Sequence, residues 1–143
     1  MRRTPLAVAI GCAVVLSLAG SLAIAQEALQ STEAMEVDIP FSFIVNRGEL
    51  PAGRYDIGPA GSHLNRLIVI GATNARAGGE LNAPVLERLA DTGTANPFVV
   101  FDNVDGKHIL SEAHYPGMDG FLVSVAGGRE THTVIHATKK VPK

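Results

Sequence analysis

The sequence contains almost no cysteine. Of its 143 residues only Cys12 carries a thiol, and it lies inside an N-terminal apolar stretch that we expect to be removed. A lipoprotein would need a cysteine at the cleavage point, so lipid attachment is not indicated. The remaining chain cannot form a disulfide, and its stability has to come from an ordinary hydrophobic core.

The chain also lacks an excess of positive charge. It has 12 Lys and Arg against 14 Asp and Glu; the part from Gln26 onward keeps ten of the basic and all fourteen acidic residues, for a net charge of −4. Binding to nucleic-acid phosphates requires clustered Lys and Arg. We therefore expect no nucleic-acid partner.

Motifs of common enzymes are missing as well. No Gly-x-Ser-x-Gly elbow occurs, and the pairs Gly78-Gly79 and Gly127-Gly128 do not stand between a strand and a helix, as a phosphate loop would require. Asp102-Asn103-Val104-Asp105-Gly106 lacks the closing glutamate of a calcium loop and is interpreted as a hairpin turn. The sequence favours a protein without catalytic activity.

The N-terminus has the three parts of a secretory signal peptide. Arg2 and Arg3 precede an apolar stretch from Leu6 to Ala25, which ends in the small-x-small site Ala23-Ile24-Ala25. Cleavage before Gln26 would release the chain to the periplasm or the extracellular space with no membrane span. The alternative is a retained anchor, since about 20 apolar residues can cross a bilayer. We expect a signal peptide at 1–25, a flexible entry segment at 26–34 and a single domain at 35–143.

The clearest pattern in the domain is an alternation from Met35 to Val45. Apolar residues occupy every second position there, which is the period of a strand with one buried face. Pro40 interrupts this run and cannot donate to a ladder, so it indicates an edge strand or a bulge. An edge at 35–45 would be a candidate for self-association, because its unpaired backbone groups can accept a second strand.

Further short apolar runs follow, separated by turn residues. We expect a compact loop at 46–53, a strand in place of a helix at 85–90, and a hairpin around Asp105-Gly106. Other strands are expected at 54–57, 67–70, 98–101, 107–113, 121–125 and 131–138. The predicted fold is all-β, a single antiparallel sandwich or small barrel of about seven or eight strands.

Four segments together suggest a relationship. They are Ile39-Pro40-Phe41-Ser42-Phe43, Leu50-Pro51-Ala52-Gly53-Arg54-Tyr55, Ile109-Leu110-Ser111-Glu112 and Pro116-Gly117-Met118-Asp119-Gly120. The chain resembles a group of small exported bacterial β-rich proteins that have no established activity. This resemblance implies an exported all-β domain and supplies no catalytic residue. Independently of it, Tyr55 is expected to begin the next strand and to pack its ring while its hydroxyl stays free to form a hydrogen bond.

Histidines are the best candidate metal ligands in a chain without thiols. His108, Glu112 and His114 alternate along one predicted strand and would share a face, where they could bind a divalent metal or serve as general acid and base. His132 and His136 would lie roughly 13 Å apart on a strand, so they could join such a site only beside ligands from a neighbouring strand. Solvated surface histidines are the alternative interpretation.

Three functions remain open from the sequence. The first is a non-enzymatic exported domain with a binding or structural role, whose partner would be a protein or a component of the cell envelope or extracellular matrix. The second is a metal-binding protein that uses the histidines and Glu112. The third is a carrier for a small apolar ligand, which the Phe, Ile and Val content would permit.

Overall fold

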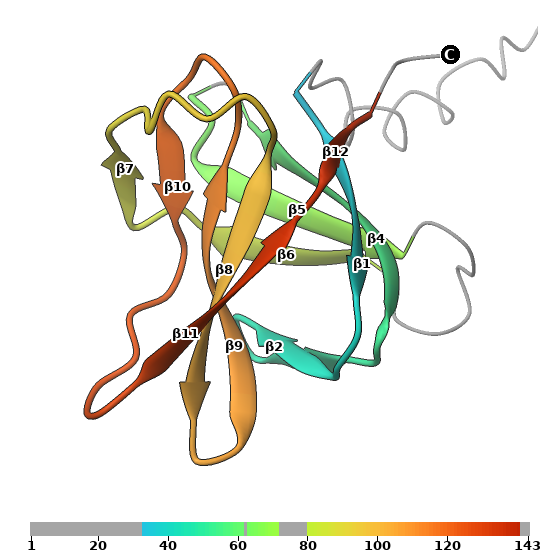
Figure 1. The fold of residues 1–143 in the computed structure, drawn as a ribbon, viewed down its shortest axis with the longest axis vertical. Helices are drawn as coiled ribbons and strands as arrows, with labels where there is room; N and C mark the ends of the chain where they lie inside the picture. The colour runs from blue at the N-terminus through green and yellow to red at the C-terminus, as the bar shows by residue number, and fades with distance from the viewer. Residues whose placement is uncertain (1–32, 62, 72–79, 141–143) are drawn as a thin grey trace, which may run out of the picture.

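The protein is a two-sheet β-sandwich (Figure 1). The computed structural model describes residues 33–61, 63–71 and 80–140, and all regular structure within them is strand. The five-stranded sheet has the order β12 (Thr138–Lys139), β1 (Met35–Ile39), β4 (Gly53–Ala60), β5 (Arg66–Gly71) and β6 (Glu80–Pro84). The seven-stranded sheet has the order β11 (Thr131–His136), β8 (Phe98–Val104), β9 (Lys107–His114), β10 (Gly120–Leu122) and β7 (Glu87–Leu89). It also contains β2 (Phe43–Val45) and β3 (Gly48–Leu50), with β2 parallel to β9.

Neither sheet closes into a barrel, so the all-β prediction is confirmed as a sandwich. The signal peptide and the entry segment up to residue 32 lie outside the described residues.

The described residues form more strands than expected, twelve in place of seven or eight. The expected single strand from Met35 to Val45 is wrong, because the chain leaves β1 at Ile39 and enters the other sheet as β2. Pro40 stands at this crossing, where its missing amide hydrogen costs no ladder bond. The C-terminal stretch likewise pairs with β8 through β11 and with β1 through β12.

The first strand provides only part of the expected sheet edge. β1 pairs with β4 along its whole length, and its residues Met35 and Glu36 also pair with β12. In Figure 1 the red C-terminal ribbon passes beside the blue β1 strand at this point. The edge proposed for self-association at 35–45 is therefore partly covered, and the long open edge lies at β11.

Two loops differ in how they match the sequence pattern. The expected compact loop at 46–53 contains β3, since Val45 pairs with Gly48 across a two-residue turn. The hairpin between β8 and β9 is confirmed. Asp105 and Gly106 both have positive φ, 50° and 77°, as a two-residue turn between twisted strands requires. In the ambiguous stretch from 85 to 90 the strand interpretation holds for Glu87–Leu89.

Aromatic rings from both sheets meet in the core. Phe43 contacts Phe101 and Tyr55 edge to face, with centroids 5.4 and 5.0 Å apart. The expected packing of the Tyr55 ring is confirmed, and its hydroxyl uses its bonding capacity to donate to the Pro51 carbonyl at 2.6 Å. The two layers are thus joined by contacts between rings.

Tyr115 joins the two sheets through a hydrogen bond. Its side chain is fully buried, and its hydroxyl donates to the carbonyl of Ile57 on β4 at 3.0 Å. Burial, with a smaller contribution from the charge of Glu33, raises the pKa of Tyr115 well above its ordinary value. The neutral hydroxyl is the form that the folded protein requires.

We expect Tyr115→Phe to lower the free energy of unfolding by about 1–2 kcal/mol at neutral pH, because the buried Ile57 carbonyl loses its donor. The pKa of Tyr115 is higher in the folded chain, so its contribution is complete below about pH 10 and is lost as the pH rises through the folded pKa. The variant should therefore lose less stability than the parent on alkalinisation. Urea unfolding at neutral and alkaline pH measures both effects, and parallel pH profiles would contradict this assignment.

Candidate functional site

A β-bulge in the β8–β9 hairpin decides where the candidate site residues point. Phe101 pairs with Leu110 but Val100 pairs with Glu112, so Ser111 is an extra residue on β9. Its hydroxyl donates to the Val100 carbonyl at 3.1 Å.

The bulge reverses the alternation of side chains along β9. Leu110 and Ala113 both belong to the core although they are three residues apart. As a result His108 lies on the inner side of the sheet, while Glu112 and His114 lie on its outer face. The prediction that these three side chains share one face of a strand is wrong, because regular alternation does not pass through a bulge.

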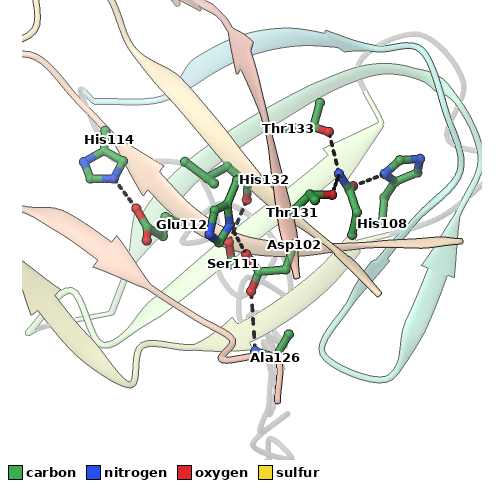
Figure 2. Close-up of polar contacts among 11 residues, drawn as sticks. Asp102, His108, Ser111, Glu112, His114, Ala126, Thr131, His132 and Thr133 are labelled. Carbon is green, nitrogen blue, oxygen red and sulfur yellow. Dashed lines mark hydrogen bonds and ion pairs between the residues drawn. The ribbon is translucent and has the colours of Figure 1, made fainter. Parts of the chain in front are cut away.

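Glu112 and His114 form the first polar pair of the outer face. His114 Nε2 lies 2.7 Å from Glu112 Oε2, and the His114 side chain is only 6% exposed (Figure 2). Since an ionised carboxylate only accepts hydrogen bonds, Nε2 is the donor. The ring stacks on Phe98 with centroids 4.5 Å apart, and its Nδ1 is buried without a hydrogen-bond partner in the described part of the chain.

Gly120 makes room for this histidine. A β-carbon at Gly120 would lie 2.6 Å from Nδ1 and 2.8 Å from Cε1 of His114, closer than atoms can approach. The buried ring therefore fits between the Phe98 ring and a position that has no side chain.

Asp102 and His132 form a second pair on the same face. Asp102 is 5% exposed and accepts from His132 Nδ1 at 2.9 Å and from the Ala126 amide at 3.4 Å. The carboxylate fixes Nδ1 as the donor, which leaves Nε2 of a neutral His132 as an acceptor. This is the arrangement of a general base held by a carboxylate. A general base of this kind would take the proton of a nucleophile, but the Ser111 hydroxyl on the neighbouring β9 donates its proton to the Val100 carbonyl instead.

His108 belongs to a third group, at the inner side of the sheet. Its Nδ1 lies 2.5 Å from Asn103 Oδ1, and its ring stacks on Phe41 with centroids 3.8 Å apart. Asn103 Nδ2 donates in turn to the hydroxyls of Thr131 and Thr133 at 3.1 and 2.9 Å. This network, on the right of Figure 2, links β9, β8 and β11 and serves the fold.

The five predicted metal ligands are therefore not brought to one point. Four of them share the outer face. Phe98 of β8, however, pairs with both His114 and His136 and so lies between these two histidines, and Val100 of β8 likewise lies between Glu112 and β11. Across residues 33–61, 63–71 and 80–140, no three His, Cys, Asp or Glu side chains gather where they could hold a metal ion. The structure assembles pairs in place of the expected divalent-metal site.

Sequence reasoning missed Asp102 and Asn103, which it assigned to a turn. The turn consists of Asp105 and Gly106 alone, and both missed residues lie within β8. An Asp-Gly turn of two residues requires its strands to begin directly on either side. That rule was the available signal that β8 extends to Val104.

No helix among the described residues is long and apolar enough to span a membrane. The apolar stretch from Leu6 to Ala25 lies outside those residues. No protein-family model, curated protein or solved structure matches the chain. The resemblance to small exported bacterial proteins stays a prediction from sequence.

Proposed function

We propose that this chain is an exported, non-catalytic β-domain that binds a partner in the cell envelope or extracellular matrix by pairing a strand with β11. The observation that supports this proposal is the open edge of the seven-stranded sheet at β11. β11 has six residues and pairs with β8 on one side only among the strands that the structure describes. Unpaired backbone groups along such an edge can accept an extended segment of another chain.

The other sheet edges in the described residues are poor acceptors by comparison. β12, β7 and β3 have two, three and three residues, and β6 carries Glu80 and ends in Pro84. Short length, charge and proline are the features by which proteins protect sheet edges. β11 contains neither proline nor Lys, Arg, Asp or Glu, and its Val134 is 49% exposed. It is the edge without these protective features.

The exported location follows from the N-terminal signal. Arg2 and Arg3, the apolar stretch to Ala25 and the small-x-small site give the expected cleavage before Gln26. We expect the form isolated from the periplasm or medium to begin at Gln26, which N-terminal sequencing and intact mass measure. A chain that stays in the membrane with Met1 or Arg2 at its start would contradict export by cleavage.

The binding role can be tested by replacing Val134 with a photo-crosslinking amino acid in cells that produce and export the protein. We expect illumination to give a defined adduct on gels, because strand pairing brings a partner backbone next to this residue. The matched control carries the same group at Leu86, which is 58% exposed and lies outside β11. Adducts at both sites, or at neither, would contradict the proposal.

A further inference from the structure

The direction of the backbone groups on β11 is fixed by two hydrogen bonds. The amide of Ala137 donates to the Pro97 carbonyl on the β8 side at 2.9 Å, and that of Lys140 donates to the Ala34 carbonyl on the opposite side at 2.9 Å. Backbone groups of successive strand residues point to alternate sides. The amides and carbonyls of His132, Val134 and His136 therefore point away from β8, to the side on which the following β12 meets β1.

The residues of this edge are compatible with pairing to a copy of themselves. Thr131–His136 has a high content of β-branched residues and carries no formal charge when its histidines are neutral. Two copies of the exported chain, each with a net charge of −4 after cleavage, would meet there without like charges facing each other across the new pair. The half-exposed Val134 would lose contact with water in the process.

The alternation restricts the ways in which two such strands can pair. In an antiparallel pair about a two-fold axis, residues that point outward must face residues that point outward. The axis therefore passes beside a residue and not between two residues. The pairing along the six residues of β11 is longest when the axis passes beside Val134, which then faces its own copy as a hydrogen-bonded pair, or beside Thr133, which then faces its own copy as a non-hydrogen-bonded pair. Both positions lie at the centre of β11.

We propose that the partner of β11 is a second copy of this chain, joined antiparallel so that the seven-stranded sheet continues across a two-fold axis. This inference rests on the proposed function and names the partner of the same edge. Isologous contacts of this kind are the commonest form of protein oligomer.

Engineered cysteines test the pairing directly, since the leader holds the sole natural thiol. In the full gene with Cys12→Ser, single variants Thr133→Cys and Val134→Cys are exported, purified and oxidised. The two-fold pair brings the Cα atoms of identical residues to about 4.5 or 5.5 Å, within the range of a disulfide. We expect a disulfide-linked dimer on non-reducing gels at one of these positions and none for the control Leu86→Cys.

The variant Val134→Lys provides a second measurement. Val134 is 49% exposed and the substitution leaves the backbone groups in place, so it keeps the β8 ladder while it places a charge on the edge strand. We expect the parent to sediment as a dimer at high protein concentration and Val134→Lys as a monomer with an unchanged urea midpoint. A monomeric parent, or no disulfide at either central position, would overturn the inference.

The cellular crosslink separates this inference from the proposed function. An adduct at Val134 whose mass is that of two copies supports both. An adduct with a different protein keeps the proposed function and overturns self-pairing. The absence of any adduct contradicts both.

Discussion

Phe101→Ala should lower the free energy of unfolding by about 3–5 kcal/mol, because it removes a fully buried ring from the centre of the core. Phe101 contacts Phe41 and Phe43 edge to face, with centroids 5.2 and 5.4 Å apart. These contacts join β8 to the segment around Pro40 where the chain changes sheets. Urea unfolding followed by circular dichroism measures the loss as a lower midpoint.

Phe98→Ala is the matched control for this substitution. Phe98 lies on the same strand, but it is on the outer face and only partly buried. Its loss removes the stacking on His114 and less buried area, so we expect a cost clearly below that of Phe101→Ala. Equal costs would mean that the core is not centred between the sheets as described.

Gly120→Ala has the second large expected effect, a loss of about 1–3 kcal/mol in the free energy of unfolding. The added β-carbon would lie 2.6 Å from His114 Nδ1 and 3.3 Å from Leu89 Cβ. To relieve this overlap the imidazole has to leave its position between Phe98 and Gly120, which also breaks its hydrogen bond with Glu112. The urea midpoint measures the cost, and the ¹H–¹⁵N signals of the His114 ring report the displacement.

Gly127→Ala separates this steric effect from the general effect of replacing a glycine. No atom lies within 4 Å of a β-carbon at Gly127, and its φ is not in the left-handed region. We expect this variant to keep or slightly raise the urea midpoint, since alanine reduces the freedom of the unfolded chain. A Gly120→Ala variant as stable as Gly127→Ala would show that His114 moves without cost.

Much of the local structure could be predicted from the sequence. The β class follows from the period of two, and the β8–β9 hairpin from Asp105-Gly106, whose residues tolerate positive φ. The interaction of Tyr55 with Pro51 is also local, because four residues separate the partners. Such features depend on the preferences of neighbouring residues, which the sequence states directly.

The candidate site could be predicted only in part. His132 and His136 lie on a strand, as expected, but the partner of His132 is Asp102, thirty residues earlier in the chain. The bulge at Ser111 depends on the register between β8 and β9, which no local pattern specifies. A shift of one residue exchanges the two faces of a strand, so an error there misplaces each side chain beyond it.

The sequence by itself determined that this chain forms short strands and that the turn of the β8–β9 hairpin lies at Asp105-Gly106. Only the tertiary structure decided that Pro40 divides one apolar run between two sheets, that β12 covers the start of β1, and that β11 has the long open edge. The physical reason is that alternation and turn residues act on neighbours along the chain, whereas strand partners are chosen by burial of apolar area between segments that are distant in sequence.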